Sequence, residues 1–552
     1  MKTRLVIALC ALVLLISGCA VAQGIESDPP DNLPDPNIIT TGVTPDLFPL
    51  SERCVFCHND VYAANGTHYS FVEDWFNSVH GQSAVDPLFL AVVRRESMLL
   101  PEAADDIQAV CAACHLPMAD MAAIALNQSR AFLENSATSN SELFKLYNDG
   151  ISCMFCHQIT SISTEQTTIF RETTLSVNLH QPPQGETRQL YGSRSSDIVA
   201  QQAMINSLGY STNPSLVERS DLICTICHNL FTDAFTVDGQ PTGIQLPEQT
   251  VSIEWVQSGW NWDPCQGCHM PIIVNEGPFS NKDIPEAAQG RIAMHSFVGA
   301  NAYLLQLNGG SYGSLDRGVA ATLEFLQSET ATLGLTSSFA ESSGANATLK
   351  LDVKLNAVVG HKFPSGFPAR RAWIHVEVFD EAGKLLYESG GYDDKGMILD
   401  NDGDLIPGAF EPHYLVIDQP GQVQIYESVM LDSNGQATTN LLQGVVYGKD
   451  NRILPEKLDK NMLREDIAVI GDAMIDPDFL ATGDITHYLI NLPAGVGNVT
   501  IKVELLYQTI GYRFMEDLLN FPSDESEALA KLVEQHPNLP VVVASEEIKV
   551  SK

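Results

Sequence analysis

Five copies of the pattern Cys-x-x-Cys-His are the residues of this sequence best suited to chemistry. They are Cys54, Cys57 and His58; Cys111, Cys114 and His115; Cys153, Cys156 and His157; Cys224, Cys227 and His228; and Cys265, Cys268 and His269. Two thiols three residues apart on a helical turn reach the two vinyl groups of one porphyrin, and the adjacent His binds its iron as the proximal ligand. The pattern therefore predicts five covalently bound c-type hemes.

Other uses of paired cysteines fit the sequence less well. Zinc ribbons need two cysteine pairs and no His directly after each pair. Thioredoxin-like sites use a single pair, and iron–sulfur clusters use other spacings. Ten of the 12 cysteines lie in the five motifs, and the other two, Cys10 and Cys19, lie at the N-terminus. No cysteine of the mature core remains for a disulfide.

The second axial ligand of each iron decides the function. An iron with histidines on both faces only exchanges electrons, whereas an open face can bind and reduce a small molecule. The chain has 14 histidines, of which five are in the motifs. The predicted distal ligands are His80, His180, His295, His361 and His68, and their number equals the number of hemes. His375 is the alternative to them, while His413, His487 and His536 are predicted to be structural.

The N-terminus has the features of an export signal. Lys2 and Arg4 precede an apolar run, 5–16, which is too short to span a bilayer but suits a signal peptide. The run ends in Ile16-Ser17-Gly18-Cys19, which resembles the bacterial lipobox; this resemblance implies that Cys19 carries a lipid anchor. The alternative is an ordinary signal peptide with an incidental Cys. We expect an exported, membrane-anchored lipoprotein on the periplasmic or cell-surface side, at the outer membrane.

The charge of the chain limits its partners. It contains 31 Lys plus Arg and 68 Asp plus Glu, giving a net charge of -37. This balance argues against nucleic acid and anionic headgroups and favours cationic partners, although acidity can also simply keep an exported protein soluble. The expected partners are redox donor and acceptor proteins, with the membrane reached through the lipid anchor.

The chain is too long for one core, and its composition divides it into four parts. These are a signal peptide with the lipobox Cys (1–19), a Pro- and Asp-rich tether (20–48), a pentaheme domain (49–340) and a β-sandwich domain with a C-terminal helix and strand (341–552). The pentaheme part supplies about 50 residues per heme, so the hemes must pack against one another. The predicted fold class is α+β: a mainly helical or irregular multiheme domain, then a β-sandwich.

Periodicity predicts the main elements of the two domains. Helices are expected at 72–80, 86–98, 104–114, 118–135, 141–149 and 318–335. Strands with alternating burial are expected at 349–355, 373–379, 423–426 and 499–505. A helix near 524–536 and a strand near 540–550 complete the chain.

Three further motifs carry a family resemblance. They are Trp75-x-x-Ser78-x-His80-Gly81, His295-x-Phe297-x-Gly299, and Gly360 to Gly366 followed by Arg370-Arg371-Ala372-Trp373. With the five heme motifs, they resemble the multiheme c-type cytochromes of bacterial respiratory and extracellular electron transfer. The resemblance implies that His361 reaches back to a heme and docks the β-sandwich onto the heme domain.

One weaker pattern clusters oxygen ligands. Asp400, Asp402 and Asp404 alternate as in a calcium loop, but the later Glu of such a loop is missing. An acidic turn is favoured over a calcium site.

Three functions remain open from the sequence. The favoured one is electron transfer, with no catalytic residue, because ordinary motifs and a matching ligand count predict closed irons. The alternatives are a reductase of a small nitrogen or sulfur oxyanion with one open heme, which applies if His68 is not a ligand, and a subunit of an extracellular heme filament or conduit.

Overall fold

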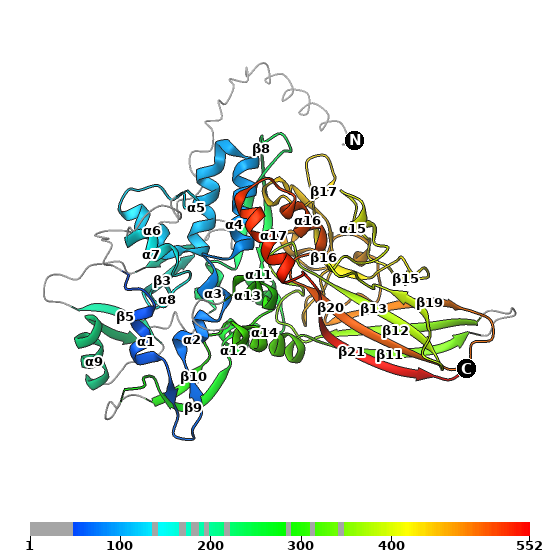
Figure 1. Ribbon diagram of the computed structural model, residues 1–552, viewed down its shortest axis with the longest axis horizontal. Coiled ribbons are helices and arrows are strands. Elements are labelled where there is room, and N and C mark those ends of the chain that lie inside the picture. Colours follow the sequence, from blue (N-terminus) through cyan, green and yellow to red (C-terminus); the bar gives the residue numbers. More distant parts are fainter. Residues whose placement is uncertain are drawn as a thin grey trace, which may run out of the picture. The chain divides into compact units, whose positions relative to one another are not determined.

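Helices and β-sheets both contribute to the fold, which confirms the mixed α+β class (Figure 1). The computed structural model describes residues 48–134, 142–164, 173–177, 187–192, 198–214, 221–282, 289–309, 315–340 and 347–552. No helix within these ranges is long and apolar enough to cross a membrane.

The part of the chain that contains the five motifs is built from short helices and two-stranded sheets. Its helices are α1 (Glu52–His58), α2 (Phe71–Phe76), α3 (Val79–Gln82), α4 (Pro87–Leu99), α5 (Ala104–His115), α6 (Pro117–Ala125), α7 (Glu142–Tyr147), α8 (Cys153–Cys156), α9 (Ile198–Leu208), α10 (Leu222–Thr225), α11 (Val251–Gln257), α12 (Cys265–His269), α13 (Ala302–Asn308) and α14 (Asp316–Glu329). Its strand pairs are β1 (Val61–Tyr62) with β2 (His68–Tyr69), β3 (Ile159–Thr164) with β4 (Thr173–Val177), β5 (Arg188–Gly192) with β6 (Tyr210–Pro214), β7 (Asn229–Phe235) with β8 (Pro241–Thr250), and β9 (Ile272–Pro278) with β10 (Gln289–Ala293).

Local signals account for the start of α4, which is predicted at residue 86 and begins at Pro87. The side chain of Asp86 accepts hydrogen bonds from the backbone N–H groups of Leu88 and Phe89, and Pro87 occupies the first helical position of α4. A carboxylate cap followed by proline is a strong start signal, because both satisfy the unpaired amides of the first turn. The cap sets the first turn of α4 and thereby the position of Phe89, which packs in the hydrophobic core.

Two predicted helices are shorter than expected. The helix predicted at 118–135 ends at Ala125, and the one predicted at 318–335 ends at Glu329. Residues 331–340 instead form a strand that pairs along its whole length with the next strand. Helical spacing and strand alternation overlap in a short apolar stretch, and strand pairing decided the conformation there.

The last part of the chain forms two larger sheets. Its strands are β11 (Ala331–Ala340), β12 (Ala347–Ala357), β13 (Arg371–Asp380), β14 (Leu385–Ser389), β15 (Val416–Ile417), β16 (Ile425–Leu431), β17 (Ala437–Thr438), β18 (Val446–Asp450), β19 (Gly483–Leu492), β20 (Val499–Gln508) and β21 (Val541–Val550). Its helices are α15 (Asp402–Leu405), α16 (Tyr512–Leu519) and α17 (Asp524–Gln535). The four-stranded sheet has the order β11-β12-β19-β15, and the other has the order β17-β16-β13-β20-β21 with β14 beside β13 and β18 beside β16. Figure 1 shows the long strands running side by side.

The inward faces of the two sheets share one hydrophobic core. Leu351 and Val353 of β12 pack in the same cluster as Val376 of β13 and Val503 of β20. The alternation predicted at 349–355 is present in the burial of β12. Strand β13 differs, because Trp373 on its other face is also fully buried. The predicted domain bounds stay predictions; residues 38–552 form one compact unit.

Candidate heme-attachment site

Each Cys-x-x-Cys-His motif lies on a helix or a helical turn. Helices α1, α5 and α12 end at His58, His115 and His269. The backbone N–H groups of His157 and His228 donate to the carbonyls four residues earlier, at 3.0 Å and 3.1 Å, so these histidines continue the turns of α8 and α10. None of the ten described cysteines forms a disulfide. The two thiols and the histidine of each motif are therefore placed as the spacing predicts.

Six histidine rings are held in the same way, by a contact between Nδ1 and a backbone carbonyl. In each, Nδ1 lies within hydrogen-bond distance of a backbone carbonyl: His58 to Phe279 (2.7 Å), His115 to Ser83 (3.3 Å), His157 to Tyr191 (2.8 Å), His269 to Val298 (2.6 Å), His295 to Ala293 (3.1 Å) and His361 to Lys362 (3.1 Å). A carbonyl only accepts, so Nδ1 carries the proton and Nε2 keeps its lone pair. Within the described residues, none of the six has a hydrogen bond at Nε2.

Two predicted distal histidines face motif histidines. The ring centroids of His80 and His228 lie 6.2 Å apart, and those of His269 and His361 also lie 6.2 Å apart. A metal–imidazole bond of about 2 Å puts the two nitrogens about 4 Å apart and the ring centres roughly 6 Å apart. Each pair can therefore hold one iron between its rings.

The third predicted distal ligand, His295, lies near two motif histidines. Its ring packs edge-on against Phe71 at 5.2 Å, and it interacts electrostatically with His157 and then His58. His295 is thus in the neighbourhood of the first and third motifs. The fourth candidate, His180, lies outside the described residues.

His68 is placed differently from the other candidates. It is exposed on β2, its Nε2 lies 3.2 Å from Asp60 Oδ1, and its ring lies 4.8 Å from that of Tyr62. The prediction that His68 binds iron has no supporting contact. The histidine of the second motif has no facing histidine ring among the described residues. Its ring, His115, instead stacks on that of Phe89, with the centroids 3.8 Å apart and the planes 5° from parallel.

Burial keeps these imidazoles neutral. It lowers the pKa of His80 to about 3 and those of His115, His228 and His295 to about 4. Removing the charged form from water is costly, and the neutral ring is the form that binds a metal. The electrostatics of the site therefore favour ligation at neutral pH.

Thiols of different motifs meet, which orders the motifs in space. Cys54 contacts Cys153, Cys114 contacts Cys227, and Cys224 contacts Cys265. Cys156 also interacts with Cys224 and Cys227. The attachment sites therefore adjoin in the order first, third, fourth, fifth, with the second beside the fourth.

A buried ionic cluster ties the loop of His361 to α11. Lys362 Nζ lies 2.8 Å from Asp450 Oδ2, and Arg452 lies 2.8 Å from the same oxygen. Glu254 of α11 accepts from the Lys362 backbone N–H at 3.0 Å and pairs with Arg452 at 3.1 Å. Sequence reasoning missed Glu254, Asp450 and Arg452, because charged residues far apart in the chain give no signal of a shared partner.

His375 and His487 belong to side-chain networks in the sheets. His375, the predicted substitute ligand, lies between Glu388 (3.1 Å) and Glu504 (3.3 Å) on β13. His487 lies between Asp352 (2.7 Å) and Asp478 (3.1 Å). Both ring nitrogens are occupied in each case, so neither ring is free to bind iron.

His413, Asp476 and Asp484 are close enough to hold a metal ion, but their hydrogen bonds assign the protons otherwise. The oxygen of Gln424 accepts the Tyr414 backbone N–H, so its amide nitrogen faces Nδ1 of His413 at 2.8 Å. Nδ1 is therefore the acceptor, and the proton on Nε2 is donated to Asp476 at 3.0 Å. This ring has no lone pair left for a metal, as predicted for a structural histidine.

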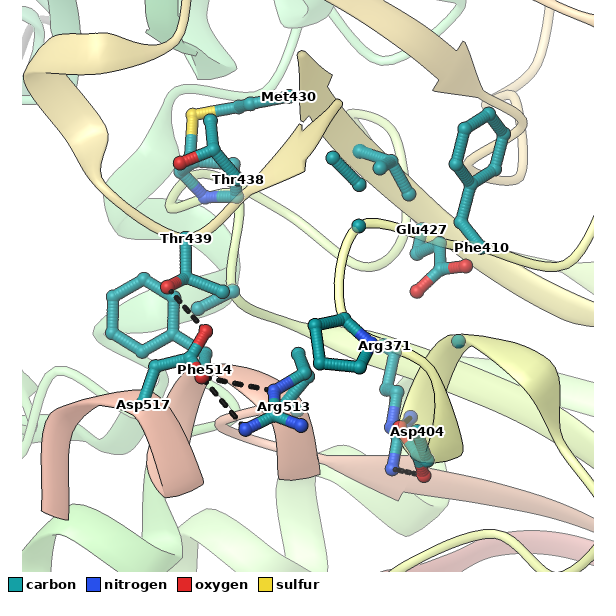
Figure 2. A pocket seen from close by; sticks show the side chains of 18 of the residues that line it. Arg371, Asp404, Phe410, Glu427, Met430, Thr438, Thr439, Arg513, Phe514 and Asp517 are labelled. Carbon is teal, nitrogen blue, oxygen red and sulfur yellow. Dashed lines mark hydrogen bonds and ion pairs between the residues drawn. The ribbon is translucent and has the colours of Figure 1, made fainter. Parts of the chain in front are cut away.

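The acidic loop at 400–404 is used for an ion pair. Both carboxylate oxygens of Asp404 accept hydrogen bonds from Arg371, at 2.7 Å and 2.9 Å. Among the described residues, Asp400, Asp402 and Asp404 do not gather their oxygens into a metal-sized cluster. Figure 2 shows the pair of Asp404 and Arg371 in a pocket of about 350 Å³, where Arg513 likewise points at Asp517. The structure favours the acidic turn over calcium.

No protein-family model matches the chain, and no curated protein matches it. One solved structure is similar: a penta-heme cytochrome c552 from Thermochromatium tepidum, with a TM-score of 0.50 and 15% sequence identity, over 92% of this chain and 100% of that one. The chain shares its overall fold with that structure. At this identity the likeness is one of fold, and the motif geometry above is the independent observation about the site.

Proposed function

We propose that this protein is an exported c-type cytochrome that transfers electrons through five covalently bound hemes. The observation that carries the proposal is the pairing of His80 with His228 and of His269 with His361 at the separation that a bis-histidine iron requires. The free Nε2 atoms of the other motif histidines and the shared fold support it.

The side chains have distinct roles in this proposal. The ten motif thiols form thioether bonds to the porphyrin, and each motif histidine binds iron from one side. His80 and His361 bind from the opposite side at the fourth and fifth motifs, and His295 does so at the first or third. His180 remains the predicted ligand of one of the other irons, and His68 has no supporting contact for such a role. When bound, the hemes supply one-electron chemistry between closely spaced irons.

Closed irons favour a carrier over an enzyme. Rings on both faces at the fourth and fifth motifs leave no position there for a substrate. We therefore propose redox proteins as donor and acceptor, with cationic surfaces that complement the charge of -37. Anchoring through Cys19, at the outer membrane, belongs to the same proposal.

A second function is favoured by one observation at the second motif. Among the described residues His115 has no ring contact with another histidine, so an iron there would lack a second histidine from that part of the chain. Glu248, which is buried and interacts with the thiols of Cys111 and Cys114, has a pKa raised by burial to about 7. A carboxyl group with this pKa can deliver protons at neutral pH, as the reduction of a small nitrogen or sulfur oxyanion requires.

One experiment separates the two functions. The holoprotein is weighed by mass spectrometry, and its oxidised and reduced forms are studied by absorption and EPR spectroscopy with carbon monoxide added to the reduced form. Five hemes, all low-spin and inert to carbon monoxide, support the carrier and exclude the reductase. A high-spin fraction of about one iron in five that binds carbon monoxide supports the reductase. A protein that matures without heme refutes both.

A further inference from the structure

Arg370 has a buried donor with no acceptor. It lies between the loop of His361 and β13, and its Nη1 donates to the Ser365 carbonyl at 2.6 Å. Its Nε is shielded from solvent and has no hydrogen-bond partner in the described part of the chain. A buried N–H of a charged group is costly to leave unpaired, so the site is built to be completed by an acceptor.

The neighbouring cationic side chains each have a carboxylate partner, which Arg370 lacks among the described residues. Arg371, its neighbour in sequence, has Asp404; Lys362 and Arg452 share Asp450. Arg370 forms no ion pair with a carboxylate among the described residues, although the chain has 68 acidic and 31 basic side chains. A guanidinium with a shielded, unpaired Nε and no carboxylate partner in so acidic a protein is available to an anion from elsewhere.

The surroundings of Arg370 identify that anion. The guanidinium interacts electrostatically with His228 and with His361, which belong to the two different histidine pairs. Its Nη1 also lies close to Gly366, as does the side-chain oxygen of Gln249. The positive charge therefore stands near the fourth and fifth attachment sites, and the anionic groups that a porphyrin held by either motif would carry are its propionate carboxylates.

We propose that Arg370 binds a propionate carboxylate of the heme attached at the fourth or the fifth motif; this rests on the proposed function. A guanidinium matches a carboxylate with two parallel hydrogen bonds, so the N–H groups of Nε and Nη2 would both gain an acceptor. The charge would also favour the reduced iron, because reduction removes one positive charge beside it.

The test compares three holoprotein variants by spectroelectrochemical titration, with hemes counted by mass spectrometry. Arg370→Gln is expected to keep five hemes and low-spin spectra at the fourth and fifth motifs. It should shift the reduction equilibrium of one heme about tenfold toward the oxidised state, or about 59 mV for one electron. Arg370→Lys should recover most of the shift, since it keeps the charge. Arg513→Gln, which removes a guanidinium already paired with Asp517, should shift none.

Two marker variants tell the sources apart. Methionine ligation raises a heme potential, so His80→Met marks the fourth heme and His361→Met marks the fifth. Whichever marked heme also responds to Arg370→Gln provides the propionate. If Arg370→Gln keeps five hemes and shifts no potential, the proposal is wrong while the proposed function stands. If added phosphate moves the wild-type potential but not that of Arg370→Gln, the ligand is a free anion and the proposal is wrong. Absence of heme from the wild-type chain refutes the proposed function first.

Discussion

The histidines near the motifs and those in the sheets differ in the partners of their ring nitrogens. Near the motifs, Nδ1 meets a backbone carbonyl and Nε2 is left free, as in His269 and His361. In the sheets, both nitrogens of His413 and His375 meet side chains. Burial alone does not identify a metal ligand; the partner of the second nitrogen does, because it fixes which atom keeps a lone pair.

The largest effect that tests this comparison is expected at His361. His361→Ala should open the iron at the fifth motif, because His269 loses the ring 6.2 Å away. We expect a new high-spin EPR signal of about one iron in five, with matching carbon monoxide binding. His375→Ala is the control, since its partners are two glutamates. Identical spectra for both variants would remove the distinction between the two groups.

The next effect concerns stability at His413. His413→Ala removes a fully buried ring together with its hydrogen bonds to Asp476, Gln424 and Asn451, so the free energy of unfolding should fall by roughly 2–4 kcal/mol. The number of hemes and their spectra should not change. Chemical denaturation measures the first and mass spectrometry the second. A loss of heme in the folded variant would show that this ring reaches the site.

A third prediction uses the buried carboxyl of Glu248. Its pKa is raised from 4.5 to about 7 by burial, so the folded state holds a proton that the unfolded state releases. This contribution is complete below pH 4.5 and is lost as the pH rises through about 7; the change corresponds to roughly 3 kcal/mol. Glu248→Gln should therefore weaken the fall in melting temperature between pH 5 and pH 8. Parallel wild-type and variant curves would contradict this.

The smallest effect is expected at His68. His68→Ala removes only an exposed contact with Asp60, so stability should change by no more than about 0.5 kcal/mol. All heme spectra should stay the same. A new high-spin signal would instead restore His68 to the predicted set of ligands and remove the case for an open iron at the second motif.

The helical turn at each attachment motif could be predicted from the sequence because its formation is local. A Cys-x-x-Cys-His motif needs one helical turn, which neighbouring residues decide. The count of distal ligands was weaker, since counting histidines does not reveal that His68 is exposed. The pairing of His80 with His228 joins residues far apart in the sequence. The same is true of the hydrogen bonds by which the carbonyls of Phe279 and Val298 orient two of the motif rings. Only the folded chain brings these together.

Strand boundaries failed for a related reason. Leu333 fits the helical spacing that predicts a helix at 318–335, yet it belongs to β11 because β12 offers a complete pairing partner. Burial of both faces of β13 was likewise invisible, since it depends on the segment that covers Trp373. Hydrophobic periodicity indicates which kind of element a segment forms. The elements packed against that segment decide where it ends and which of its faces are buried.

The position of His361 in the chain has a consequence for biogenesis. The ring reaches His269 only after α13, α14, β11 and β12 have been made and the cluster of Glu254, Lys362 and Arg452 has closed. Chains emerge and fold from the N-terminus, so the fifth motif is the last to be finished. Under the proposed ligation, a truncated chain that lacks the sheets would leave His269 without its facing ring, so completion of the fifth centre would depend on completion of the sheets.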